Sequence, residues 1–505
     1  MSLVRRRSNS KQNSPTNESD WSDLIPVLPG TGAPAHALYD ELRRLIETGR
    51  LAPGTKLPPT RLLAARIGVS RGAAVAAFER LVADGFAEAR VGSGTRVAAR
   101  VPMLPKARAV PGPDRPDRPA PVLPGTLGGA DADDRTARIF RRLLTRDLGR
   151  RIAVAGHYGD PRGGARLRRE IAAYLRAARG VRCDPEAIVL TSGSQHGLDL
   201  VIRAALAPGD AVWIENPAYG FARAALAGAG LELVAVPVDG EGLDVAAGSA
   251  LRATARAAFV TPSHQFPLGV TLSMPRRLAL LDWAKRTGAW ILEDDYDGEF
   301  RFAGAPLTSL QGIGDGDRVV YLGSFSKALH PGLRVGYAVL PPALVEPVLA
   351  VRARSDRFPS ILAEEALADL LAEGHFAAHV RRARRRARLA RDALVEGLAG
   401  GPWRVAAPDQ GLHLIAALDE AVDDVALVAT LAAAGLGVRA LSAMYLGRPA
   451  RRGLVVGFSG FAPEALAAAG RRAAKAAWAA IGGGGEGGLF IPPPREDDGG
   501  RGEPR

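Results

Sequence analysis

Cysteine is almost absent from this 505-residue chain: it has one, Cys183, so no disulfide can form within the chain. A single thiol fits a reducing compartment. No apolar run follows Arg5, Arg6 and Arg7, as it would in a secretory signal, and the uncharged stretch 425–438 is too short for a bilayer. These absences predict a soluble, cytoplasmic protein.

Lysine is also scarce, with six residues, so 60 of the 66 basic side chains are arginine and the net charge is +13. An arginine surplus in a chain rich in alanine and glycine can reflect a GC-rich genome, so charge alone does not establish nucleic-acid binding. Because lysine is scarce, a lysine inside an ordered motif is less readily explained as a generic surface residue. The 47% hydrophobic and 24% charged residues exclude a mainly disordered chain.

Composition shifts divide the chain into segments. We predict a disordered N-terminal tail (1–23), a helical DNA-binding domain (24–98), a proline-rich linker (99–130), a large α/β domain (131–481) and a disordered C-terminal tail (482–505). The linker assignment depends on eight prolines within 99–130 and on the lack of apolar periodicity there.

The N-terminal domain carries the pattern of a winged helix-turn-helix. An apolar stripe from Ala35 predicts a helix that Gly49 ends, and a second helix is expected over 60–67. A third should begin after the N-cap Ser70 and run to Asp84, with a buried stripe of Val75, Phe78, Leu81 and Val82. Short strands at 89–91 and 95–97 then form a hairpin around 92–94.

Five residues of this domain are candidates for DNA contact. Ser70 and Arg71 open the recognition helix, Arg61 opens the helix before it, and Gly94 and Arg96 belong to the wing. A three-helix protein-interaction module with exposed arginines is the alternative. Residues 38–97 resemble the GntR-type winged helix-turn-helix, which favours DNA. Gly72-Ala73-Ala74 stands where family members commonly have Asn-Thr after Ser-Arg, so the operator sequence cannot be transferred from relatives.

From residue 131 onward helical segments alternate with short apolar strands. The strands are expected at 187–190, 211–214, 231–236, 257–260, 290–292 and 319–322. This alternation predicts an α/β fold with a mostly parallel sheet covered by helices. A long helical run from about Glu373 leads into a smaller α+β section that ends near Ile481.

Three segments of the α/β domain carry candidate chemistry. Ser324-Phe325-Ser326-Lys327, with Arg334 seven residues further on, combines an amine able to condense with an aldehyde and groups able to hold phosphate. The acids at the end of 291–296 could keep a pyridine nitrogen protonated. Thr191-Ser192-Gly193-Ser194-Gln195 leads from a strand into a helix N-terminus suited to phosphate. Each segment alone could equally be an ordinary turn or cap.

Together, these segments make residues 155–480 resemble fold-type I pyridoxal 5'-phosphate (PLP) aminotransferases. The resemblance implies that Lys327 is the internal-aldimine lysine, that Asp294 pairs with the pyridine nitrogen and that Tyr296 donates to the ring hydroxyl. The phosphate ligands it implies are Ser194, Gln195, Ser324 and Arg334. It also places Tyr219 on the cofactor ring and Tyr158 at the phosphate of a neighbouring subunit, although both tyrosines could be half-buried core aromatics.

The string 260–302, together with Gly374-His375-Phe376 and Gly411-Leu412-His413, is more specific. It resembles the MocR/GabR-type regulators, in which a GntR-type reader is fused to an aminotransferase-like domain. Two departures weaken an enzymatic reading. Phe266-Pro267-Leu268-Gly269 replaces the usual Asn-Pro-x-Gly, leaving His264 or Gln265 to contact the ring hydroxyl. Val455 stands where an arginine usually binds the substrate carboxylate, and the spacing does not place Arg448, Arg451 or Arg452 there.

Residues 381–391 hold seven arginines and no acid. They predict either a solvated helix face or a second basic surface for DNA.

The resemblance implies a cytoplasmic, homodimeric transcriptional regulator. It would sense PLP, an amino compound or both through the aldimine at Lys327, bind double-stranded DNA, and control genes of vitamin B6 or amino-compound metabolism. Two alternatives stay open: a working aminotransferase with an accessory DNA-binding module, and a DNA-binding repressor with an empty pocket. No metal site is expected.

Overall fold

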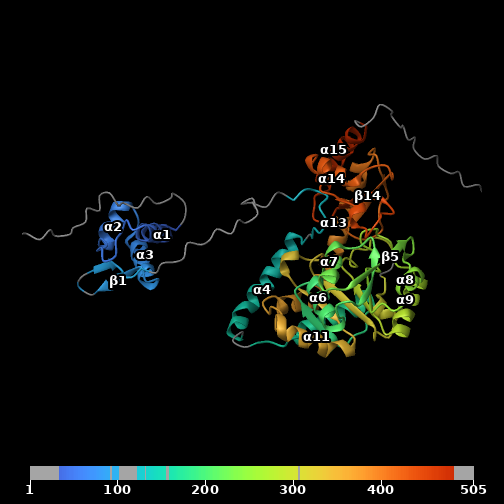
Figure 1. Ribbon diagram of the computed structural model, residues 1–505, viewed down its shortest axis with the longest axis horizontal. Helices are drawn as coiled ribbons and strands as arrows, with labels where there is room; N and C mark the ends of the chain where they lie inside the picture. Colours follow the sequence, from blue (N-terminus) through green and yellow to red (C-terminus); the bar gives the residue numbers. More distant parts are fainter. Residues whose placement is uncertain are drawn as a thin grey trace, which may run out of the picture. The chain divides into compact units, whose positions relative to one another are not determined.

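The computed structural model describes residues 33–90, 92, 94–101, 122–130, 132–154, 158–304 and 307–482. The chain divides into two compact units, one up to Pro119 and one from Ala120 (Figure 1). The predicted N-terminal tail (1–23), linker residues 102–121 and residues 483–505 of the predicted C-terminal tail (482–505) lie outside the described residues. Gly482, the first residue of that predicted tail, is instead the last residue of a helix. No helix in the described ranges is long and apolar enough to cross a membrane.

The first unit has the predicted order of elements. These are α1 (Pro34–Glu47), α2 (Thr60–Ile67), α3 (Arg71–Ala83), β1 (Ala87–Arg90) and β2 (Gly94–Val97), with the two strands antiparallel. The Ser70 hydroxyl caps α3 by accepting a hydrogen bond from the Ala73 amide, 3.1 Å away.

The buried stripe of α3 differs from the predicted one. Ala74, Ala77, Phe78 and Leu81 are buried, whereas Val75 is half-buried and Val82 is 37% exposed. The buried set follows the spacing i, i+3, i+4, i+7 of a single helix face, and Val82 lies one residue beyond it. Ala74 and Ala77 are only weakly hydrophobic, so the sequence pattern favours the larger Val75 and Val82 for the buried stripe.

The second unit is built on an eight-stranded sheet of order β3-β10-β9-β8-β7-β4-β5-β6. The strands are β3 (Ile188–Thr191), β4 (Ala211–Asn216), β5 (Glu232–Asp239), β6 (Gly242–Leu243), β7 (Ala257–Val260), β8 (Trp290–Asp294), β9 (Val319–Ser324) and β10 (Gly336–Val339). The five strands from β9 to β5 are parallel, which confirms the predicted sheet. β10, which was not predicted, is antiparallel to both neighbours.

Helices cover both faces of this sheet (Figure 1). The helices of this part are α4 (Asp134–Val154), α5 (Ala165–Arg179), α6 (Ser194–Ala205), α7 (Gly220–Gly228), α8 (Val245–Arg252), α9 (Met274–Thr287), α10 (Leu310–Ile313), α11 (Pro342–Ser355) and α12 (Glu364–Ala372). α6, α7 and α11 pack on one face and α8 and α9 on the other. Trp213 of β4 stacks on Trp283 of α9, with ring centroids 3.9 Å apart. The continuous apolar strands are explained by burial on both faces.

A smaller α+β layer completes the unit. Its four-stranded antiparallel sheet has the order β11-β12-β14-β13, and it is covered by α13, α14 and α15. The bounds are α13 (His375–Leu398), β11 (Arg404–Val405), β12 (His413–Leu418), α14 (Asp424–Ala433), β13 (Arg439–Ala440), β14 (Arg452–Gly457) and α15 (Pro463–Gly482).

The predicted linker extends too far towards the C-terminus. Residues 122–130 pack on the second unit: Gly437 donates its amide to the Pro124 carbonyl (2.8 Å) and Gly457 donates to the Gly125 carbonyl (2.7 Å). Leu127 packs against the apolar cluster that contains Val455. The prolines of this segment led to its assignment to the linker. Its attachment depends on backbone hydrogen bonds, and these produce no periodic pattern of apolar residues in the sequence.

The arginine-rich segment lies on α13, and much of it turns towards the body of the unit. Arg382 and Arg386 pair with Asp133, and Arg384 donates to the Glu299 carbonyl. Arg391 is buried and donates to the Pro408 carbonyl. Arg381, Arg385 and Arg388 remain exposed. The segment is therefore neither a uniformly solvated face nor a continuous basic surface.

Close packing of α13 on α15 gives a first prediction. A Cβ on Gly397 would lie 2.6 Å from the Ala467 carbonyl oxygen, so Gly397→Ala should force the two helices apart. We expect a loss of about 1–3 kcal/mol in unfolding free energy, measured by urea denaturation. Gly228→Ala in α7, where a Cβ meets nothing within 4 Å, is the matched control and should be neutral or slightly stabilising. Equal destabilisation by both changes would contradict this account.

Candidate functional site

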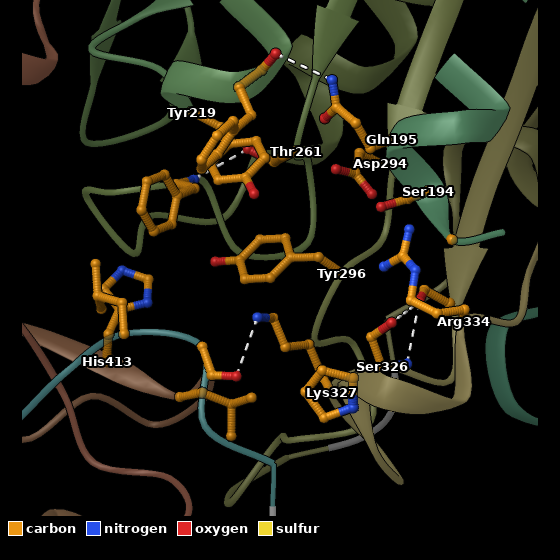
Figure 2. A pocket seen from close by; sticks show the side chains of 18 of the residues that line it. Ser194, Gln195, Tyr219, Thr261, Asp294, Tyr296, Ser326, Lys327, Arg334 and His413 are labelled. Atoms are coloured by element: carbon orange, nitrogen blue, oxygen red, sulfur yellow. Dashed lines mark hydrogen bonds between the residues drawn. The ribbon is translucent and has the colours of Figure 1, made fainter. Parts of the chain in front are cut away.

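A cavity of about 320 Å³ opens in the second unit (Figure 2). β8 ends at Asp294 and β9 at Ser324, and these two parallel strands deliver their side chains to the same edge of the sheet. Figure 2 shows Arg334 and Ser194 at one end of the cavity and His413 at the other. The site therefore combines groups that the chain separates by more than 200 residues.

Lys327 projects into the cavity three residues after the end of β9. Its Nζ donates a long hydrogen bond, 3.4 Å, to the Gly128 carbonyl. Burial lowers the pKa of this ammonium, against the attraction of Asp297 and Asp294, and the positive charge of Arg439 lowers the pKa further. A lowered pKa raises the fraction of neutral amine, which is the nucleophilic form.

Asp294 lines the cavity and has a buried carboxylate oxygen, Oδ1, with no hydrogen-bond partner among the described residues. Burial, with the nearby charges of Asp295 and Asp297, raises the pKa of this carboxyl to about 7. A buried carboxylate without a partner either takes up a proton or is paired with a cationic donor. A protonated pyridine nitrogen is such a donor, so Asp294 fits the role implied by the resemblance.

The raised pKa of Asp294 gives a second prediction. In the unfolded chain the carboxyl titrates near 3.8, so between about pH 4 and 7 the folded protein holds a proton that the unfolded chain has lost. Stability must therefore fall as the pH rises through this window. Asp294→Asn removes the effect: the cofactor-free variant should match wild type near the acid end and exceed it above pH 7, by at most about 4 kcal/mol.

Thermal denaturation across this pH range measures the difference. Asp282→Asn, at an exposed carboxylate on α9, is the control and should show no such pH-dependent gain. An Asp294→Asn variant that is less stable than wild type at every pH would show that the carboxylate is satisfied in the cofactor-free protein.

The opposite end of the cavity is suited to a phosphate. α6 begins at Ser194, and its first turn presents free amide groups. Ser324 accepts a hydrogen bond from the Ser326 amide (3.0 Å), and the Ser324 and Ser326 hydroxyls are 2.8 Å apart. Arg334 adopts left-handed backbone geometry (φ 53°), which is strained for a residue with a side chain and is typical of functional sites.

Gly193 allows the Arg334 guanidinium to approach this helix end. Its φ of +107° is accessible mainly to glycine, and a Cβ there would lie 3.4 Å from the guanidinium. With Lys327 and Asp294, these groups match the aldehyde, ring nitrogen and phosphate of PLP, so the residues present fit the cofactor.

Three of the remaining predicted cofactor residues line the cavity, and Tyr158 does not. Gln195 and Tyr219 line the cavity, and Gln195 donates from Nε2 to the Phe221 carbonyl (3.1 Å). Tyr296 lines it as well. Tyr158 does not: it is 68% exposed, packs edge-on against Phe358 and lies under the Arg357 guanidinium, 3.8 Å from the ring centroid. The alternative prediction, that Tyr158 is a half-buried aromatic of the core, is therefore wrong.

The prediction for His264 and Gln265 needs correction. Neither side chain is part of the cavity wall. His264 is buried behind Tyr296, with Nδ1 2.8 Å from Asp297 Oδ2 and 2.9 Å from the Tyr296 hydroxyl. Gln265 uses its amide to hold the backbone of Pro217, Phe266 and Leu268. His264 therefore positions Tyr296, while Phe266 takes the place on the cavity wall.

The structure adds cavity residues that the sequence analysis did not assign as cofactor ligands. They are Leu127, Gly128, Gly193, Phe221, Thr261, Phe266, Ser326, Pro331, Leu412, His413 and Arg439. Leu127 and Gly128 were missed because they had been assigned to the linker. Ser326 and His413 lie in motifs already noted, and those motifs could have indicated them. No local pattern marks Arg439.

In the first unit, Arg61 and Arg71 are exposed, and neither makes an ion pair with another described residue. Ser70 is held as the cap of α3. In the wing, Gly94 has φ +83°, and Arg96 donates to the Gly54 carbonyl (3.2 Å). Lys56 forms a β-bridge with Arg96, which adds a second positive charge beside the wing. The arrangement leaves the start of α3 and the wing open to a polyanion.

Comparison with known proteins agrees with both units. Residues 34–97 match the family model of bacterial regulatory proteins, gntR family, and residues 152–453 match aminotransferase class I and II. The probable rhizopine catabolism regulatory protein MocR of Rhizobium meliloti is 36% identical over 457 residues, covering 85% of this chain and 90% of its own. The HTH-type pyridoxine biosynthesis transcriptional regulator PdxR of Corynebacterium glutamicum is 34% identical over 425 residues, covering 83% and 91%.

Among solved structures, LysN, an α-aminoadipate aminotransferase from Thermus thermophilus, has 28% identity and a TM-score of 0.66 over 72% of this chain and 93% of that one. It was solved in complex with N-(5'-phosphopyridoxyl)-L-leucine. Fold and site thus define a fold-type I aminotransferase-like domain, whose family cofactor is PLP, joined to a GntR-type winged helix-turn-helix. The chain belongs to the MocR/GabR-type family of transcriptional regulators.

Proposed function

We propose that this protein is a cytoplasmic, homodimeric transcriptional regulator that binds double-stranded DNA through its first unit and senses PLP, with or without an amino compound, through its second. The observation that carries the proposal is the cavity itself. It retains Lys327, the unpartnered Asp294 and the phosphate end around Arg334, in a chain that also carries a DNA reader.

When bound, PLP supplies an aldehyde that condenses with amines and a ring that withdraws electrons. The residues of the chain provide the rest. Lys327 supplies the amine at the aldehyde, and Asp294 holds a proton on the ring nitrogen. Tyr296, positioned by His264, donates to the ring hydroxyl, and Tyr219 covers the ring. Ser194, Ser324 and Arg334 hold the phosphate, with Gln195 beside them.

Two features favour sensing over routine turnover. Val455 is fully buried on β14, so a substrate carboxylate is not held at the usual position, from which it would be oriented for proton abstraction. Because a DNA-binding domain is fused to the cavity domain, ligand binding can change DNA binding. This requires that the ligand binds two arrangements of the protein with different affinity. One relative is named as a probable rhizopine catabolism regulatory protein and the other as a pyridoxine biosynthesis transcriptional regulator, which supports amino-compound or vitamin B6 genes as targets.

The exposed Tyr158 supports the dimer. Its ring lies outside the cavity of its own chain, on the surface beside Phe358 and Arg357, where it could reach the phosphate end of a second copy. A dimer would also present two reader domains to two half-sites of an operator.

Fluorescence anisotropy with a labelled duplex from the region upstream of the gene tests the proposal. PLP, alone or with an amino compound, should change the DNA affinity, and keto-acid formation should not continue over many turnovers. Steady keto-acid production, with a DNA affinity insensitive to PLP, would favour the second candidate, a working aminotransferase, which the intact cofactor site keeps open.

A further inference from the structure

The missing carboxylate-binding arginine has a replacement on the neighbouring strand. In the sheet of the smaller layer, Arg439 of β13 pairs directly with Val455 of β14 in antiparallel register. Directly opposed residues of an antiparallel pair project from the same face, with Cβ atoms about 5 Å apart. A guanidinium at 439 therefore leaves the sheet on the same side as the position that Val455 occupies.

That side is the cavity side. Val455 packs in an apolar cluster with Leu441 and Tyr445, against Leu127, and Leu127 lines the cavity. Arg439 itself lines the cavity together with Lys327 and Tyr219. Burial lowers the pKa of Lys327 and raises the pKa of Tyr219, and the positive charge of Arg439 acts to lower both. The guanidinium thus lies close enough to influence the amine that would receive an amino compound.

Arg439 makes no ion pair or side-chain hydrogen bond with any residue that the structure describes. The other arginines of this region are placed differently. Arg452 pairs with Asp423 and Asp424, and Arg448 and Arg451 are exposed and do not line the cavity. Arg334 serves the phosphate end. The cavity therefore has two guanidinium groups, one beside the serines and one on the wall formed by the smaller layer.

We propose that Arg439 binds the carboxylate of the amino compound that this protein senses, and so selects amino acids over simple amines. The inference rests on the proposed function, because it needs a cofactor at Lys327 to receive the amino group. Moving the guanidinium from β14 to β13 changes its point of attachment but keeps a bidentate donor available to a carboxylate. The effector class is then a carboxylate that carries a primary amine.

The test uses the full-length protein loaded with PLP and two matched probe pairs: L-alanine with ethylamine, and β-alanine with propylamine. Binding is followed by the shift of the visible absorbance band and, independently, by titration calorimetry. Wild type should bind at least one amino acid about ten to a hundred times more tightly than its matched amine. Arg439→Gln should remove this preference while leaving amine affinity and the PLP band intact, and Arg439→Lys should restore part of it.

Arg448→Gln, an equal loss of charge outside the cavity, is the control and should keep the wild-type preference. The assignment is overturned if amines bind wild type as tightly as amino acids, if neither amino acid binds, or if Arg439→Gln retains the preference. A protein that shows no visible band with PLP would instead contradict the proposed function, so the two failures are distinguishable.

Discussion

Lys327→Ala should abolish the visible absorbance that PLP gives the protein, together with borohydride fixation at this position. Lys327 is the one lysine on the cavity wall, and the other described lysines, Lys56, Lys285 and Lys475, are exposed elsewhere. No other described amine could form the imine with the aldehyde. The PLP-dependent change in DNA affinity should be lost with the band.

The experiment needs proof that the variant still folds. Pyridoxamine 5'-phosphate offers it, because this vitamer carries its own amine and requires Arg334 and Asp294 but no covalent bond to lysine. It should raise the melting temperature of both wild type and Lys327→Ala, as any ligand of the native state does. Lys285→Ala, on the surface of α9 beside Asp315, should keep the band.

Two results would count against the covalent assignment. A band that persists in Lys327→Ala would place the reactive amine elsewhere. A wild-type protein that stays colourless in excess PLP would leave a DNA-binding repressor with an empty pocket, the third possibility that the sequence allows.

Arg71→Ala should weaken binding to the specific operator by about 1–3 kcal/mol, roughly five to one hundred and fifty times in the dissociation constant. Arg71 is the first residue of α3, is exposed, and makes no ion pair with another described residue. Its guanidinium is therefore available to a base edge or a phosphate at the helix end that enters the major groove.

Salt dependence separates the two kinds of contact. If Arg71 reads a base, the loss should be larger on the operator than on unrelated DNA. A phosphate contact should weaken binding to both and reduce the salt slope by about one. Arg44→Ala on α1, whose guanidinium pairs with Glu41, is the control of equal charge and should change little. Equal losses for the two variants would indicate a general effect of charge.

Much of the site was predictable because its chemistry lies in short contiguous motifs. Ser324 and Asp294 are the last residues of strands, Ser194 is the first residue of a helix, and Lys327 comes three residues after a strand; local apolar patterns mark those ends. The places where prediction failed share one cause. Leu127, Gly128 and Arg439 reach the cavity through long-range packing, and no neighbour in the chain reveals that.

The case of His264 shows a different limit. Its place in the chain, near the expected asparagine, suggested direct cofactor contact, but the side chain turns behind Tyr296 and bonds to Asp297. The rotamer of a side chain depends on the space that the surrounding segments leave. Here the His264 ring lies against Gly411, where a side chain larger than hydrogen would not fit. A motif identifies the residues near a site but not which of them face the ligand.

By itself, the sequence determined the two units, the order of the elements in the first, the mostly parallel sheet of the second and many of the residues that line the cavity, because helix periodicity, strand runs and turn residues act over a few positions. Tertiary structure alone decided which face of α3 is buried, where the linker ends, and which arginine stands across from Val455. Those outcomes depend on pairing between strands and on packing between distant segments, which only the folded chain brings together.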